Sequence, residues 1–195
     1  MTDYAGRHAV VLGLGLTGLT LARWLERHGA TVRVADTRPH PPNAARLADE
    51  LPGVRLETGP ITAATLAGAD LIAISPGVPK DQGAIVEAVA AGAELAGDVE
   101  LFARALPPGQ KVLAITGTNG KTTTTALVGE LARAAGLAAT VAGNIGSAVL
   151  DVLAAIEAGA PWPDVFVLEL SSFQLETVSS LKPTAAAVLN VTPNH

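Results

Sequence analysis

The stretch that most constrains the fold of this chain is VLAITGTNGKTTTT, residues Val112 to Thr125. It predicts a short apolar strand, a glycine-containing loop, and a helix that opens at Lys121. Glycines let backbone N–H groups surround a polyphosphate, and the N-terminus of a helix favours the same negative charge. The stretch therefore predicts a phosphate-binding loop, with Lys121 on the outer phosphates and the Thr122 hydroxyl on Mg²⁺.

This loop is shorter than the common G-x-x-x-x-G-K-[ST] pattern, because the position five residues before Gly120 is Ile115. An ordinary turn followed by a solvated lysine is the alternative interpretation. That alternative does not account for glycines, a lysine and hydroxyls falling in order between a strand and a helix. The predicted phosphate contacts are Gly117, Thr118, Asn119, Gly120, Lys121, Thr122 and Thr123.

A second glycine turn opens the chain. The predicted strand His8 to Leu12 leads into Gly13-Leu14-Gly15-Leu16-Thr17-Gly18, a G-x-G-x-x-G that begins a helix ending near His28. The next strand, Thr31 to Ala35, ends in Asp36, close to the spacing at which a dinucleotide fold places its ribose-binding acid. Arg38, two residues on, could pair with a phosphate. In the plainer alternative, Asp36 only ends a strand and Arg38 is solvated.

The rest of the first half keeps alternating between strands and helices, which predicts a parallel, doubly wound sheet. Gly77, in Ser75-Pro76-Gly77, follows a strand's carboxyl end, where open α/β sheets bind ligands, although a plain turn is equally compatible. The segment Leu106 to Gln110, with two prolines and a glycine, predicts a linker between domains of residues 1–106 and 111–195. The predicted elements are helices at 43–51, after 62, at 81–91 and at 98–105, and strands at 54–57 and 70–74.

The second half predicts a carboxylate beside the phosphate loop. The apolar run DVFVLE predicts a buried strand, Asp164 to Glu169, and an acid at the end of such a strand holds Mg²⁺ in nucleotide hydrolases. The alternative is a surface glutamate at a strand end. The other predicted elements are a helix to about 135, strands at 138–142 and 184–190, a glycine turn at 143–146, and a helix at 147–157.

Composition argues against several classes of function. The net charge is −5, with 18 acidic against 13 basic residues, which argues against nucleic acid as the main partner. There is no cysteine for a disulfide or a thiolate zinc site, which fits a reducing cytoplasm. The apolar stretch Ala9 to Ala22 is too short to span a bilayer and lacks a cleavage site, so no membrane insertion is expected.

Four motifs together resemble the ATP-dependent Mur ligases of peptidoglycan synthesis. They are GTNGKTTT (117–124), GNIG (143–146), ELSSFQLE (169–176) and NVTPNH (190–195). Within that family, GLGLTG, DTR, SPG and above all LELSSFQLE are similar to the D-glutamate-adding members. ELSSFQLE is the most specific part, because folylpolyglutamate synthases share the GTNGKT-type loop. The resemblance implies a Rossmann-like N-terminal domain followed by a partial P-loop ATPase-like central domain.

The resemblance also implies substrates and roles. The glycine-turn domain would bind the uridine nucleotide of UDP-N-acetylmuramoyl-L-alanine rather than NAD. ATP would phosphorylate the alanine carboxylate, and the amine of D-glutamate would attack the acyl phosphate to give an amide. The implied substrate contacts are Leu16, Thr17, Asp36, Thr37, Arg38, Gly77, Asn144 and His195; the catalytic residues are Lys121, Glu169 and His195; the Mg²⁺ ligands are Thr122, Glu169 and His195.

Two departures limit the resemblance. The family often has an acid immediately before the histidine, where this chain has Asn194. The family also continues with the rest of the central domain, including a carbamylated lysine, and with a C-terminal domain that helps to bind adenine and D-glutamate. The 195-residue chain is therefore expected to be inactive alone, and the full-length enzyme to be a cytoplasmic monomer.

Other functions stay open at this point. A related Mur ligase or a folylpolyglutamate synthase-like ligase would share the phosphate loop. A nicotinamide-dependent oxidoreductase built on GLGLTG would have to account for the separate phosphate loop, and no hydride-site residues are evident. A nucleotide-binding module without catalysis is the third alternative.

Overall fold

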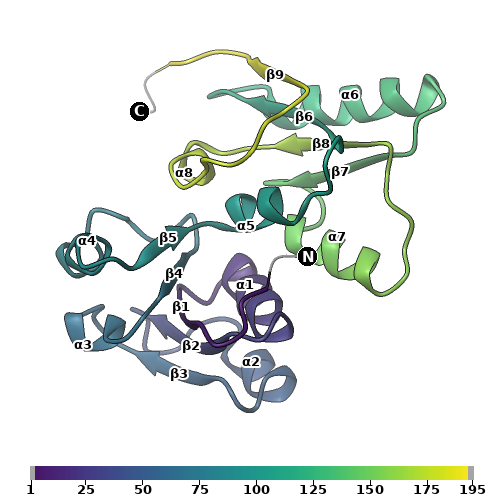
Figure 1. The fold of residues 1–195 in the computed structure, drawn as a ribbon. Helices are drawn as coiled ribbons and strands as arrows, with labels where there is room; N and C mark the ends of the chain where they lie inside the picture. Colours follow the sequence, from purple (N-terminus) through teal and green to yellow (C-terminus); the bar gives the residue numbers. More distant parts are fainter. Residues whose placement is uncertain (1–2, 193–195) are drawn as a thin grey trace. The chain divides into compact units, whose positions relative to one another are not determined.

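The computed structural model describes residues 3–192 and places the chain in two compact units, one up to Leu101 and one from Phe102. Each unit is a parallel β-sheet with helices packed on it (Figure 1). The predicted α/β class with two parallel sheets is confirmed.

The first unit contains a five-stranded parallel sheet with the order β3-β2-β1-β4-β5. This order places β1 between β2 and β4, so the chain reverses its direction of winding there, and such switch points are where open α/β sheets bind ligands. Its elements are β1 (His8–Leu12), α1 (Leu16–Arg27), β2 (Thr31–Asp36), α2 (Ala44–Glu50), β3 (Arg55–Thr58), α3 (Ala63–Leu66), β4 (Leu71–Ile74), α4 (Gly83–Ala90) and β5 (Glu94–Ala96).

Apolar strand residues form the core of this unit. All four residues of β4 are buried, as expected when both faces of a parallel sheet are covered. On one face, Val10 and Ile72 pack with Leu66 of α3 and Ile85 of α4. The helix α1 packs against β1 and β2. Because this core fixes the strands, it also fixes the loops at their carboxyl ends.

The turn between β1 and α1 depends on a close approach of backbone atoms. A Cβ atom on Gly18 would lie 1.8 Å from the carbonyl oxygen of Gly13, so no larger residue fits there without moving the helix. The hydroxyl of Ser75, at the end of β4, donates to the same carbonyl across 3.1 Å. The G-x-G-x-x-G therefore sets how closely α1 begins to the sheet.

The second unit contains a four-stranded parallel sheet with the order β7-β8-β6-β9. The central strands β6 and β8 pair in register, with Ile115 opposite Glu169. The helix α6 packs on β7 and β8, while α7 packs on β7. The elements are β6 (Lys111–Thr116), α6 (Lys121–Ala134), β7 (Ala139–Gly143), α7 (Val149–Glu157), β8 (Val165–Glu169), α8 (Ser172–Leu175) and β9 (Ala185–Val188).

The helix α5 (Asp98–Ala105) spans the division between the units. Phe102 belongs to the second unit, and its ring packs edge to face on Phe166 of β8 with 5.1 Å between the ring centroids. The second unit begins at Phe102, four residues before the predicted linker starts at Leu106. The linker segment therefore belongs to the second unit.

Candidate functional site

The first group of predicted residues lies at the carboxyl edge of the five-stranded sheet. Leu16 begins α1 and is 71% exposed, and Thr17 follows it. Thr37 and Arg38 follow β2 and are exposed, as is Gly77, which follows β4. Since β2, β1 and β4 are parallel neighbours, the chain brings these residues to one edge of one sheet.

Asp36 is buried at this edge, and both of its carboxylate oxygens are engaged. Oδ2 accepts hydrogen bonds from the Leu14 N–H at 2.6 Å and from Arg38 Nη2 at 2.6 Å. Oδ1 accepts from the backbone N–H and from Nε of Arg38, each at 2.8 Å. The Arg38 guanidinium is the main cause that lowers the pKa of Asp36 to about 2, and the Leu14 N–H lowers the pKa further against the opposing effect of burial.

This network assigns Asp36 a structural task. A carboxylate that accepts from the Leu14 N–H holds the glycine turn to the end of β2, whichever ligand binds outside it. The Arg38 side chain remains about half exposed, so its outer face can still meet a phosphate.

The phosphate loop of the second unit follows β6 and leads into α6. Gly120 is the N-cap of the helix and has a left-handed backbone with φ of 83°. The first backbone N–H groups of a helix have no partner within it and carry partial positive charge, so α6 offers an anion site at Lys121, Thr122 and Thr123. The Lys121 ammonium donates to the carbonyl oxygens of Gly117 at 2.7 Å and Thr118 at 3.1 Å, so it lies across the loop.

Glu169 ends β8 beside this loop. Its side chain is 1% exposed, and Oε1 accepts a hydrogen bond from Asn144 Nδ2 at 2.7 Å. Oε2 is buried and has no hydrogen-bond partner within residues 3–192. Register places Glu169 opposite Ile115, two residues before the loop opens at Gly117.

The turn after β7 is shaped to fit Glu169. Gly143 pairs with Glu169 in the sheet, and a Cβ atom on Gly143 would lie 2.3 Å from the Glu169 carbonyl oxygen. That glycine also has φ of 107°, a left-handed conformation that L-residues rarely adopt. The Asn144 N–H donates to the same carbonyl at 2.9 Å. GNIG therefore fixes both the backbone and the side chain of Glu169.

These residues fit a magnesium ion that a nucleotide brings with it. No three His, Cys, Asp or Glu side chains cluster as a metal cage within the described part of the chain. Mg²⁺ is typically bound by one or two carboxylates together with substrate phosphates, and a buried carboxylate oxygen without a partner supplies such a ligand. Thr122 is the second residue of α6 and carries a hydroxyl, a further oxygen of the kind that Mg²⁺ accepts.

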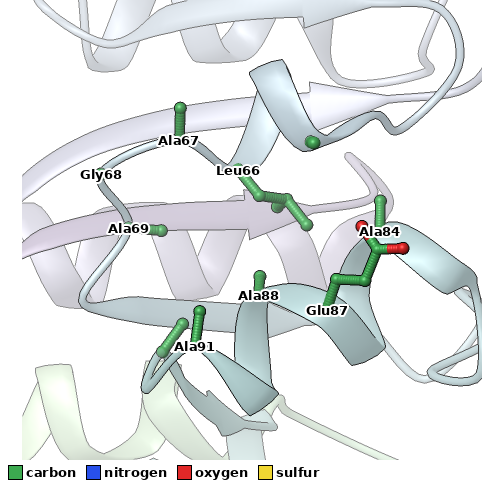
Figure 2. A pocket seen from close by; sticks show the side chains of 10 residues that line it. Leu66, Ala67, Gly68, Ala69, Ala84, Glu87, Ala88 and Ala91 are labelled. Carbon is green, nitrogen blue, oxygen red and sulfur yellow. The ribbon is translucent and has the colours of Figure 1, made fainter.

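His195 lies outside the described residues, so the predicted metal and substrate contact there has no described position. A cavity of about 400 Å³ between α3 and α4 is lined mostly by alanines, together with Leu66 and Glu87, and contains none of the predicted residues (Figure 2).

Sequence reasoning missed Asn190, which forms hydrogen bonds with the phosphate loop, although Asn190 begins the NVTPNH motif. Among the described residues, no helix has the length and apolar character to cross a membrane.

Family models match most of the chain. Residues 7–97 match the model for the Mur ligase MurD-like N-terminal domain, and residues 115–195 match the Mur ligase middle domain. The two matches fall on the two units and include the glycine turn of the first and the phosphate loop of the second.

Curated relatives are similar along nearly the whole chain. The UDP-N-acetylmuramoylalanine–D-glutamate ligase of Thiobacillus denitrificans is 58% identical over 98% of this chain and 43% of its own length. The ligase of the same name from Chromobacterium violaceum is 54% identical over 99% of this chain and 43% of its own length. The chain thus spans less than half the length of these relatives.

Solved structures share the fold. The UDP-N-acetylmuramate:L-alanyl-gamma-D-glutamyl-meso-diaminopimelate ligase of Neisseria meningitides aligns with a TM-score of 0.57 at 24% identity, covering 98% of this chain and 62% of that one. The UDP-N-acetylmuramate-alanine ligase of Thermotoga maritima aligns with a TM-score of 0.53 at 22% identity, covering 97% and 42%.

Proposed function

We propose that this chain, which belongs to the Mur ligase family, supplies the substrate-nucleotide domain and the ATP-phosphate site of a ligase that adds D-glutamate to UDP-N-acetylmuramoyl-L-alanine. The observation that carries the proposal is the buried Glu169 carboxylate beside the phosphate loop, with one oxygen fixed by Asn144 and the other without a described partner. The relatives at 58% and 54% identity support the choice of substrates. Because the chain spans 43% of their length, the activity is proposed for the full-length ligase.

The proposed reaction activates a carboxylate, because an amine does not displace oxide from a carboxylate. A carboxylate oxygen of the alanine attacks the γ-phosphorus of ATP, the bond from that phosphorus to ADP breaks, and an acyl phosphate forms. The amine nitrogen of D-glutamate then attacks the acyl carbon and loses a proton. The bond to phosphate breaks as the amide forms. The products are ADP, phosphate and the amide.

Within this reaction the loop residues bind and orient the transferring phosphate. Lys121 would exchange its two carbonyl partners for phosphate oxygens, which places its charge where negative charge develops. The N-terminus of α6 would meet the same oxygens. Glu169 and Thr122 would hold Mg²⁺, which when bound neutralises phosphate charge and favours transfer.

In the first unit, the state of Asp36 favours a uridine nucleotide over NAD. A dinucleotide fold uses this acid to accept hydrogen bonds from ribose hydroxyls. Here four hydrogen bonds from Leu14 and Arg38 already occupy both oxygens. A uridine nucleotide can instead use exposed groups at the same edge, including the outer face of Arg38 for a phosphate, together with Thr37 and Gly77.

The proposal also covers the cellular compartment and the oligomeric state of the full-length enzyme. A ligase that consumes ATP and a UDP-linked precursor fits the cytoplasm, and the full-length protein is proposed to act there as a monomer. Residues outside this chain are proposed to complete the D-glutamate and adenine sites, so the 195-residue chain is proposed to be inactive in ligation.

Calorimetric titration of one sample with UDP-N-acetylmuramoyl-L-alanine, MgATP and NAD tests the proposal. Saturable binding of the UDP-linked substrate, with no heat from NAD, is expected. Saturable NAD binding with no response to the UDP-linked substrate would indicate an oxidoreductase-type domain and overturn the proposal. The matched variant is Arg38→Gln, which should weaken binding of the UDP-linked substrate. It should leave MgATP binding unchanged, because Arg38 belongs to the first unit and the phosphate loop to the second.

A further inference from the structure

Asn190 contacts the phosphate loop through both its backbone and its side chain. Its carbonyl oxygen accepts from the Thr118 N–H at 3.0 Å, and its Oδ1 accepts from the Asn119 N–H at 2.9 Å. Its Nδ2 donates to the Asn119 carbonyl oxygen at 3.0 Å. Asn190 thus engages three consecutive peptide groups of a loop that precedes it by about 70 residues in the chain.

The strand β9 carries Asn190 to this position. It runs parallel to β6, with Val188 opposite Thr116, and the pairing continues when the Leu189 N–H donates to the Thr116 carbonyl oxygen at 3.0 Å. The loop then passes directly over the next peptide, because a Cβ atom on Gly117 would lie 3.1 Å from the Asn190 nitrogen. Since β9 ends where the loop begins, Asn190 can reach the loop only in this register.

A second pair of bonds strengthens the contact. The Thr192 N–H donates to the Thr118 hydroxyl at 3.1 Å, and that hydroxyl donates to the Thr192 carbonyl oxygen at 3.2 Å. The N–H groups of Thr118 and Asn119 are therefore directed at the segment after β9. An incoming phosphate would then meet the N–H groups at the start of α6 and the Lys121 ammonium.

We propose that Asn190 is a positioning residue that holds the phosphate loop in its nucleotide-binding shape before the nucleotide arrives. The inference rests on the proposed role of this loop in binding ATP phosphates. A loop whose peptides are already oriented loses less conformational freedom on binding than a loop that must be ordered by its ligand. Asn190 itself does not need to touch the nucleotide.

Three variants of the 195-residue chain test this role. Asn190→Ala removes both side-chain bonds to Asn119, whereas Asn190→Asp keeps an acceptor for the Asn119 N–H and loses the donor to its carbonyl oxygen. Gln110→Ala is the matched control, because it removes a side-chain bond of 3.0 Å to the Pro163 carbonyl oxygen in the same unit, away from the loop. Circular dichroism establishes that each variant folds.

The first readout is amide hydrogen exchange followed by NMR without ligand. We expect the Asn119 amide to exchange about tenfold faster in Asn190→Ala, and at close to the wild-type rate in Asn190→Asp and Gln110→Ala. Wild-type exchange at Asn119 in Asn190→Ala would overturn the proposal.

The second readout is the Kd for MgATP from calorimetry. We expect Asn190→Ala to raise the Kd about tenfold, while Gln110→Ala leaves it unchanged and both variants bind UDP-N-acetylmuramoyl-L-alanine as the wild type does. Faster exchange with an unchanged Kd would show a purely structural contact and overturn the positioning role. If the wild-type chain bound neither ligand, the proposed function would fail, and the exchange measurement would still decide whether Asn190 orders the loop.

Discussion

Asn144 donates a hydrogen bond from Nδ2 to Oε1 of Glu169 across 2.7 Å, and the buried Oε2 of the same carboxylate has no partner within residues 3–192. A buried carboxylate oxygen without a partner is costly, so its position beside the phosphate loop supports the proposal that Mg²⁺ binds there together with the nucleotide. Asn144 then sets the direction in which the remaining oxygen points.

The first prediction concerns Glu169→Ala in the full-length ligase. Removing the carboxylate should loosen Mg²⁺ and slow acyl phosphate formation by about 10²–10³-fold, because transfer depends on charge stabilisation at the phosphate. Added Mg²⁺ should restore part of the rate. The measurement is single-turnover formation of ADP at increasing Mg²⁺ concentration.

Asn144→Ala is a milder variant that tests the same metal site. It leaves the carboxylate in place and removes only its orienting bond, so apparent Mg²⁺ affinity should fall by about 10–100-fold, with fuller rescue at high Mg²⁺. Equal rates in the wild type and in both variants would show that the carboxylate does not act at the metal.

The second prediction concerns Lys121→Ala in the full-length ligase. The Lys121 ammonium donates to the carbonyl oxygens of Gly117 and Thr118, and these neutral partners leave its charge available to a phosphate. Its loss should slow acyl phosphate formation by about 10²–10³-fold and leave binding of the UDP-linked substrate unchanged. Near-normal single-turnover rates would mean that the loop has been assigned to the wrong ligand.

The third prediction is a pH dependence of stability that arises from Asp36. The pKa of this carboxyl is lowered from 3.8 to about 2 in the folded chain, mainly by Arg38. The stabilisation is therefore complete above the unfolded pKa and is lost as the pH falls from about 4 to 2, by on the order of 2 kcal/mol.

Urea unfolding between pH 2 and 5 checks this dependence in a Trp162→Phe background, so that the fluorescence of Trp24 reports on the first unit alone. Arg38→Gln removes the main cause of the shift and should flatten the pH dependence in this window. An identical slope with and without Arg38 would refute the assignment.

The fourth prediction concerns a buried hydroxyl in α6. Thr125 is fully buried, and its hydroxyl has no hydrogen-bond partner in the described part of the chain. Thr125→Val removes an unsatisfied polar group at nearly constant volume, so it should leave the free energy of unfolding unchanged or raise it by about 1 kcal/mol.

Thr20→Val is the matched control, because Thr20 is also a buried residue but its hydroxyl donates to the Thr17 carbonyl oxygen at 2.9 Å. The same change there should lower the free energy of unfolding by about 1 kcal/mol. Thermal unfolding of both variants measures the contrast. Destabilisation by Thr125→Val equal to that of Thr20→Val would show that the Thr125 hydroxyl is satisfied.

Strong local signals predicted the long elements of this fold. The strand His8–Leu12 was predicted with its observed bounds, because an apolar run ends directly at a glycine turn. The strand Glu94–Ala96 was missed, because three residues with one acid carry no readable alternation. The short helix Ser172–Leu175 was also missed, although Ser171 and Gln174 form a capping box that could have indicated its start.

The candidate site was predictable as residue types and less so as contacts. The sequence predicted Glu169 near the loop, because Glu169 ends one apolar strand of a parallel sheet and the loop follows another. The bond from Asn144 to Glu169 spans 25 residues and the bonds from Asn190 to Asn119 span 71, so they depend on the order β7-β8-β6-β9. Strand order is set by long-range packing, and no local pattern reports it.

The most direct measurement of the central claim is ADP formation by the full-length ligase with UDP-N-acetylmuramoyl-L-alanine, MgATP and one amino acid at a time. The account predicts amide product and ADP with D-glutamate, and little of either with L-glutamate, L-alanine or meso-diaminopimelate. The 195-residue chain, assayed beside it, should give no product that depends on D-glutamate. Turnover of the full-length protein that does not respond to D-glutamate, or product from the 195-residue chain alone, would contradict the account.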